Sequence, residues 1–228
     1  MAGLGRVCAT LGAEMTEMLF GAAAALSLLF WLGFSTRGPS WVKSLIKTAS
    51  VALLAAAALT AGGPFWLVAA LMLGAVGDFC LSRHGERWFL GGVAAFALAH
   101  IAYIVLFQQV DGFDLAQVTQ GWRATTALAL VAFAVVMARL LWPRTGALRG
   151  AVMIYLCIIV AMGLAALGLP VAGLAMLGAL FFVISDAVLA AELFLIPKGH
   201  RAHFRTPYVV WATYWGAQAL FYWAFALA

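Results

Sequence analysis

The chain consists of apolar segments, each about 20 residues long, separated by short stretches rich in Gly, Pro and charged residues. A helix of about 20 apolar residues is long enough to cross the hydrocarbon core of a bilayer. Hydrophobic residues make up 66% of the chain and charged residues only 9%, against about 45–50% and 25% in soluble domains. This composition excludes a soluble globular domain, a disordered chain and a coiled coil. The segments cover residues 15–34, 42–61, 64–81, 88–107, 122–141, 148–167, 171–196 and 207–227.

These segments predict an all-α fold, a polytopic membrane bundle of about eight transmembrane helices in a single transmembrane domain over residues 1–228. The first segment resembles a signal peptide, but apolar segments continue to the last residue, so we interpret it as a first span. We therefore expect a multi-pass membrane protein. Few Lys, no Asn and abundant Ala and Gly favour a bacterial origin, and hence the inner cell membrane.

The basic residues predict the orientation of the bundle. All Lys and Arg residues except Arg6 and Arg123 lie in or near the loops after the first, third, fifth and seventh segments. Loops that retain positive charge stay on the cytoplasmic side, so both termini are expected outside. The net charge of +5 then indicates contact with lipid headgroups and no nucleic-acid partner. Cys8, Cys80 and Cys157 form no close pair, so neither a disulfide framework nor a zinc ribbon is predicted.

A short internal repeat divides the chain into two halves. The tetrapeptide Met-Leu-Gly-Ala occurs at 72–75 and again at 176–179, and each copy is followed in its segment by Asp-x-x-Leu, at Asp78 and at Asp186. Four segments per half would make the halves parallel repeats. We therefore predict two four-helix halves, approximately 15–107 and 122–227.

Asp78 and Asp186 lie inside apolar segments, where an ionisable side chain costs about 2.5–3.5 kcal/mol on insertion scales. At about 1.5 Å per residue, the two carboxylates lie roughly 21 Å and 22 Å from the starts of their helices, so they share one level in the cytoplasmic half. Such groups persist where they are buried against partners or line a wet cavity. We interpret both as candidate functional residues, and the alternative is that they only hold helices together.

Polar aromatic residues follow each aspartate in the next segment. His100 and Tyr103 share one helix face, as do Tyr214 and Gln218. Four helices carrying these side chains and the two aspartates could enclose one polar pocket. For the tyrosines and the glutamine, simple helix packing is the alternative interpretation.

Basic residues near the inner ends of the segments could bind a phospholipid headgroup. The candidates are Lys47, Arg83, Arg87, His200 and Arg201. The alternative is that these residues only fix the topology. The spacing of His200 and His203 would suit a metal, but a basic loop repels cations and two ligands are too few for zinc, so we predict no metal site. Glu192 lies on another face from Asp186 and is expected to reach the membrane surface.

Taken together, these residues resemble the YhhN-like integral membrane proteins over nearly the whole chain. The motifs that carry the resemblance are Gly77-Asp78-x-x-Leu81, Phe96-x-x-x-His100-x-x-Tyr103, Gly178 with Ser185-Asp186, and Tyr214-x-x-x-Gln218. The sequence departs from many such proteins at Lys47-Thr48, where a Lys-Pro pair is expected, which affects only how the second helix would bend.

The resemblance implies lysoplasmalogenase activity, the hydrolysis of the vinyl ether bond of a lysoplasmalogen to a fatty aldehyde and glycerophosphoethanolamine or glycerophosphocholine. A vinyl ether is hydrolysed by protonation of carbon, and water then captures the resulting oxocarbenium ion. One carboxylic acid can donate the proton while a second carboxylate stabilises the cation or activates water. We expect Asp78 and Asp186 to share these roles in either order. His100, Tyr103, Ser185, Tyr214 and Gln218 would orient them or bind substrate.

This chemistry needs no metal or organic cofactor, and the expected partners are a lysophospholipid substrate and bilayer lipid. An intramembrane aspartyl protease would need a glycine where Ala75 stands. The main alternative is a small proton-coupled transporter, in which Asp78 and Asp186 would form a proton relay.

Overall fold

The computed structural model describes residues 2–171, 173–197 and 199–227, and describes side chains from residue 11 onward. Within this part of the chain 82% of the residues are helical and no strand occurs. Eight long helices follow one another, which confirms the predicted all-α fold. They are α1 (Ala2–Gly33), α2 (Trp41–Thr60), α3 (Phe65–Leu81), α4 (Glu86–Gln108), α5 (Gly121–Leu141), α6 (Arg149–Leu167), α7 (Leu174–Ala190) and α8 (Thr206–Phe225). The short helical turns are η1 (Leu115–Thr119), η2 (Gly146–Leu148), η3 (Ala191–Leu195) and η4 (Arg201–Phe204).

Six of the helices have both the length and the apolar composition of a membrane span. They are α1, α2, α4, α5, α6 and α7, the last counted together with η3. Helix α3 is equally apolar but has only 17 residues. Helix α8 has 20 residues and is not among these six. Each of the eight predicted segments coincides with one long helix, so a bundle of about eight helices is confirmed.

Local residue chemistry sets where several helices begin and end. The Ser40 side chain accepts a hydrogen bond from the Lys43 backbone N–H at 3.1 Å and caps the start of α2. Gly62 follows the end of the same helix with φ +76°, a conformation that glycine adopts without strain. One boundary differs clearly from the prediction, because helix α1 begins at Ala2, well before residue 15. The seventh segment ends close to the predicted residue 196, in the π-helical turn η3.

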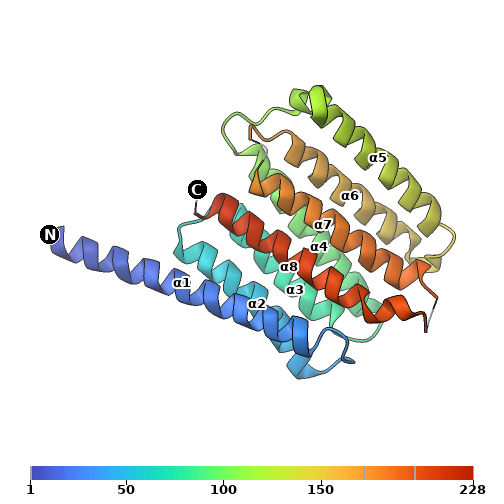
Figure 1. The fold of residues 1–228 in the computed structure, drawn as a ribbon, viewed down its shortest axis with the longest axis horizontal. Coiled ribbons are helices and arrows are strands. Elements are labelled where there is room, and N and C mark those ends of the chain that lie inside the picture. The colour runs from blue at the N-terminus through green and yellow to red at the C-terminus, as the bar shows by residue number, and fades with distance from the viewer. Residues whose placement is uncertain (1, 172, 198, 228) are drawn as a thin grey trace.

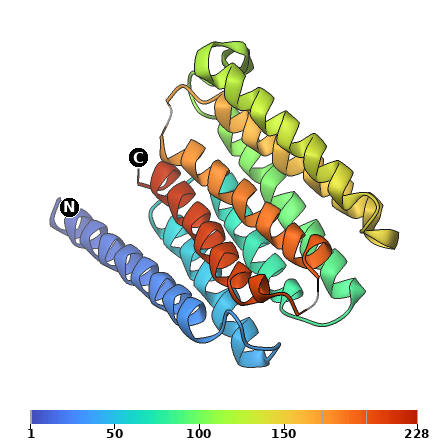
Figure 2. The ribbon, with the colours of Figure 1, turned by 45° about the vertical axis from the view of Figure 1, so that its right-hand side comes forward.

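Helices adjacent in sequence run antiparallel and mostly pack side by side (Figure 1). The exception is the junction between the predicted halves, where α4 packs against α6 and α5 lies at the outer edge of the bundle (Figure 1). Helix α1 lies at the opposite edge, against α2 and α8, and both termini lie at one end of the bundle (Figure 2). Helix α8 packs on α7 and also contacts α1, α2 and α3, so it joins the two halves.

The two ends of the bundle differ in charge. Helices α1, α3, α5 and α7 end where α2, α4, α6 and α8 begin, so their connecting loops gather at one end. Arg37, Lys43, Arg83 and Arg144 lie at this end, which we call the basic end, whereas Arg123 lies at the other. This is the charge asymmetry on which the predicted orientation depends.

Aromatic side chains fill the centre of the bundle. Tyr103 of α4 packs on Phe221 of α8 with ring centroids 4.3 Å apart, and Phe182 of α7 lies against both. Gly178 permits this packing, because a Cβ atom there would lie 2.9 Å from the Phe221 ring. Gly74, the matching residue of the repeated tetrapeptide, also faces α8.

Candidate active site

Asp78 is almost completely buried and is held by side chains from two other helices. Its Oδ1 lies 2.9 Å from the Nζ of Lys47 on α2, and its Oδ2 accepts a hydrogen bond of 2.8 Å from the Tyr214 hydroxyl on α8. Lys47 was predicted to bind a headgroup, but the structure places its ammonium against the aspartate. The cation compensates the carboxylate charge, which is costly to bury alone.

A buried hydrogen-bonded chain continues from Tyr214 toward α4. The Gln218 Nε2 donates to the Tyr214 hydroxyl at 3.3 Å, and the Tyr103 hydroxyl donates to the Gln218 Oε1. Gly74 leaves the space for this chain, because a Cβ atom there would lie 2.6 Å from the Gln218 Nε2. The structure thus joins Asp78, Tyr214, Gln218 and Tyr103 in one network.

Asp186 lies on α7 and has different partners. The Tyr155 hydroxyl on α6 donates to its Oδ2 at 2.6 Å, and the Nε2 of His100 on α4 lies 3.6 Å from the same oxygen. The His100 Nδ1 lies 2.5 Å from the Phe96 carbonyl oxygen one helical turn earlier. Because a carbonyl only accepts, Nδ1 carries the proton and Nε2 can serve as an acceptor when the ring is neutral. This Nε2 is buried without a hydrogen-bond partner and faces Asp186.

The residues that contact the two aspartates differ in type but occupy corresponding positions in the two predicted halves of the chain. Each is contacted by the seventh residue of the preceding helix, Lys47 of α2 or Tyr155 of α6. Each is also contacted from the last helix of the opposite half, Asp78 by Tyr214 and Asp186 by His100. Each aspartate is thus contacted by one residue of its own predicted half and by one residue of the other half.

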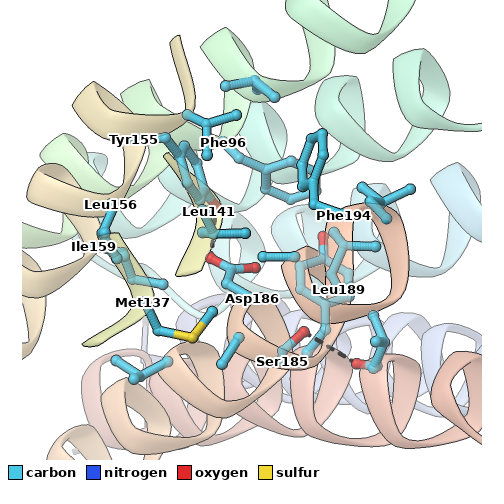
Figure 3. Close-up of a pocket in the computed structure, with 18 of the residues that line it drawn as sticks. Phe96, Met137, Leu141, Tyr155, Leu156, Ile159, Ser185, Asp186, Leu189 and Phe194 are labelled. Atoms are coloured by element: carbon cyan, nitrogen blue, oxygen red, sulfur yellow. Dashed lines mark hydrogen bonds between the residues drawn. The ribbon is translucent and has the colours of Figure 1, made fainter. Parts of the chain in front are cut away.

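A deep cavity lies beside Asp186 (Figure 3). It holds about 980 Å³ of space between atoms, part of it open to the surroundings. The polar side chains on its wall are Lys47, Tyr155, Ser185, Asp186 and Tyr214. The Ser185 hydroxyl donates to the Val210 carbonyl at 3.2 Å and so ties α7 to α8. The apolar wall includes Phe96, Met137, Leu141, Leu156, Ile159, Leu189 and Phe194.

A second cavity of about 830 Å³ adjoins the first at the basic end. The two share Lys47, Leu81, Leu189, Val210 and Tyr214 in their walls. The second cavity is also lined by Lys43 and by Glu192. Asp78 lines neither cavity, but its partners Lys47 and Tyr214 line both.

The structure separates the other predicted headgroup residues from both cavities. The Arg83 guanidinium lies over the Trp41 ring, 3.5 Å from its centroid. Arg87, His200 and Arg201 are exposed at the basic end, where the His200 ring accepts a hydrogen bond from the Ala202 backbone N–H. None of these four residues is among those that line either cavity.

Tyr155 contacts an aspartate but was not singled out from the sequence in any role, whereas Lys47 was singled out as a headgroup residue. Tyr155 interrupts an apolar run with a single hydroxyl, which is ordinary in membrane helices. The only signal was positional, since it occupies the same place in α6 as Lys47 occupies in α2. Comparing the two halves of the chain residue by residue would have found it.

Comparisons with known proteins show the family of the chain. The family model described as the YhhN family matches residues 42–225. A pig protein named lysoplasmalogenase TMEM86B (Sus scrofa) is 34% identical over 203 residues, which is 86% of this chain and 80% of the relative. A human protein named lysoplasmalogenase TMEM86A (Homo sapiens) is 31% identical over 219 residues, 88% of this chain and 84% of the relative.

A bacterial protein is similar to the same extent. The protein named lysoplasmalogenase of Mycobacterium tuberculosis is 33% identical over 201 residues, 82% of this chain and 72% of the relative. No solved structure matches the chain. The family match begins at α2 and ends at the last residue of α8, so it includes both aspartates and all the side chains that hold them. From this match and these relatives, the chain belongs to the YhhN family.

Proposed function

We propose that this protein is a membrane-embedded lysoplasmalogenase, an ether hydrolase that converts a lysoplasmalogen to a fatty aldehyde and glycerophosphoethanolamine or glycerophosphocholine. The observation that carries the proposal is the cavity beside Asp186, in which one carboxyl group faces a largely apolar space. The mammalian and mycobacterial relatives named lysoplasmalogenase support the same reaction.

The cavity suits a lipid with one hydrocarbon chain. Side chains from α4, α5, α6 and α7 form an apolar wall, and the polar side chains on it are few. An alkenyl chain would lie along the wall, with the vinyl ether next to Asp186. Apolar surroundings also exclude bulk water, which would otherwise compete for the proton.

Asp186 acts as the proton donor in this mechanism. Its Oδ2 is occupied by the Tyr155 hydroxyl, which leaves Oδ1 for the substrate. The carboxylic acid transfers its proton to the vinyl carbon that is not bonded to oxygen, and an oxocarbenium ion forms at the other carbon. The resulting carboxylate stabilises this cation and takes a proton from the water that attacks it. The hemiacetal then breaks its bond to the glycerol oxygen, which takes up the hydroxyl proton, and the aldehyde is released.

Asp78 acts through Lys47 and Tyr214. A bare lysine cation in the cavity wall would raise the free energy of an oxocarbenium ion nearby. Asp78 compensates that cation at 2.9 Å and holds the Tyr214 hydroxyl in a fixed direction. His100 lies on the same side of Asp186 as Tyr155, with its Nε2 3.6 Å from the Oδ2 that the Tyr155 hydroxyl contacts. Asp186 is therefore the catalytic residue, and Asp78 is an electrostatic and positioning residue.

The test is aldehyde release from lysoplasmenylethanolamine and lysoplasmenylcholine by the purified wild type and by variants. Asp186→Asn should abolish turnover, because the amide has no proton to give to carbon. Asp78→Asn should lower turnover and stability together, and the exposed loop variant Asp111→Asn should resemble the wild type. Turnover by a folded Asp186→Asn protein would refute the assignment. No turnover by a folded wild type would refute the function, and the next assay would be proton-coupled transport in liposomes.

A further inference from the structure

The second cavity has a chemical character of its own. It lies at the basic end, where α1, α3 and α7 end and α2 and α8 begin. Its charged lining residues are Lys43, Lys47 and Glu192. Asp78 already compensates the charge of Lys47. The cavity lining therefore offers a ligand one positive charge, on Lys43, and one negative charge, on Glu192. That balance suits a ligand that carries both charges.

The Lys43 ammonium can bind a phosphate group. Its ammonium donates hydrogen bonds to the backbone carbonyls of Ser35, at 3.3 Å, and of Arg37. An ammonium has three N–H donors, so one remains for a ligand. The two carbonyls fix the cation at the cavity wall, so that a phosphate there would not have to order a free lysine side chain.

The Glu192 carboxylate can bind an ammonium group. It belongs to the π-helical turn η3, which continues α7 and directs this side chain into the second cavity. Its only ion pair in the described part of the chain is with His203, whose Nδ1 lies 3.9 Å from Oε1. That separation is longer than a hydrogen bond, so both carboxylate oxygens can accept hydrogen bonds from a ligand.

Aromatic rings stand next to these charges. Phe30 of α1 and Trp211 of α8 line the cavity with centroids 4.3 Å apart. Lys43 and Lys47 already place their ammonium groups 5.8 Å and 5.7 Å from the Phe30 and Trp211 ring centroids. Rings that attract lysine cations also attract a quaternary ammonium group.

We propose that the second cavity binds the zwitterionic headgroup of the lysolipid, with the phosphate at Lys43 and the amine at Glu192 beside the Phe30–Trp211 pair. The identity of the lipid rests on the proposed function. The shared wall of the two cavities then places the glycerol backbone next to Lys47 and Tyr214, between the headgroup and the alkenyl chain. Glu192 thereby selects for an amine-bearing headgroup.

The test uses four alkenyl lipids, with phosphoethanolamine, phosphocholine, phosphate alone, or no headgroup on the glycerol. Glu192→Gln should raise KM about tenfold for the two amine lipids, the effect of one charge-assisted interaction, and leave the phosphate lipid unchanged. Lys43→Gln should raise KM for all three phosphate-bearing lipids and leave the alkenylglycerol unchanged. Glu86→Gln and Arg87→Gln, both exposed at the same end, are the matched controls.

A second experiment measures the Kd of saturated ether analogues for the same variants. It tests headgroup binding independently of the vinyl ether hydrolase activity. These analogues cannot be hydrolysed by protonation of carbon, so the headgroup pattern in Kd should persist even if the chain has no vinyl ether hydrolase activity. The proposal is overturned if Glu192→Gln weakens the amine and phosphate analogues equally, or if neither variant differs from its control.

Discussion

The Tyr155 hydroxyl donates a hydrogen bond of 2.6 Å to Asp186, the proposed proton donor. Tyr155→Phe removes this hydrogen bond and keeps the ring in the cavity wall. Because the bond fixes the direction of the proton donor, we expect kcat to fall about ten- to a hundredfold with little change in KM. Steady-state aldehyde release measures this, with Tyr208→Phe as control. An unchanged kcat would contradict the orienting role.

Gly74 is a residue at which a single methyl group should disturb the network around Asp78. In Gly74→Ala the new Cβ would lie 2.6 Å from the Gln218 amide and 3.2 Å from the Tyr214 hydroxyl. We expect a loss of about 1–3 kcal/mol in unfolding free energy and a lower kcat, because Tyr214 must move from Asp78. Gly21→Ala in α1 is the control, since its Cβ would meet no atom within 4 Å. Thermal unfolding in detergent compares the two, and equal midpoints would contradict the prediction.

Some residues of the candidate site could be recognised from the sequence and others could not. Asp78, Asp186 and His100 were recognisable because each is an ionisable group within an apolar segment. Tyr155 was not, since a tyrosine in a membrane helix needs no special explanation. Glu192 was expected on another face from Asp186, and it lines the second cavity but not the cavity beside Asp186. The π-helical turn at Ala191–Leu195, which contains Glu192, could not be predicted from any pattern in the sequence.

At the level of helices, the Lys47–Asp78 ion pair joins α2 to α3. Asp78→Leu or Lys47→Met alone should cost about 3 kcal/mol, because each leaves one buried charge without its partner. The double variant should recover most of that stability, since both charges are gone, but it should remain impaired in turnover. A double-mutant cycle of unfolding in detergent gives the coupling energy. Additive losses would show that the pair contributes nothing to the packing of the two helices.

Helix positions were predictable and helix neighbours were less so. The eight apolar segments correspond to the eight long helices, because the thickness of the bilayer imposes their length. The packing of α4 against α6, with α5 displaced to the edge, could not be deduced, because apolar faces without a strong pattern fit several neighbours. The sequence also suggested a single polar pocket, whereas in the structure Asp78 and Asp186 have separate partners and Asp78 lines neither of the two cavities.

For the whole molecule, the charge difference between the two ends predicts how the protein sits in a membrane. In a variant whose native cysteines are replaced by serine, Asp111→Cys lies at the weakly charged end and Gly38→Cys at the basic end. A membrane-impermeant maleimide added to intact spheroplasts should label the first and not the second. Permeabilised membranes, in which both should react, are the control. The reverse pattern would contradict the orientation with both termini outside.

Because each aspartate is contacted by a helix of the other predicted half, the proposed active site should behave like the interface of a heterodimer whose two subunits share one chain. Two fragments divided in the loop between α4 and α5 would each lack a partner for their own aspartate. Such fragments should be inactive alone and complement one another when produced together. During denaturation, activity should therefore be lost when the two halves separate, before either half unfolds.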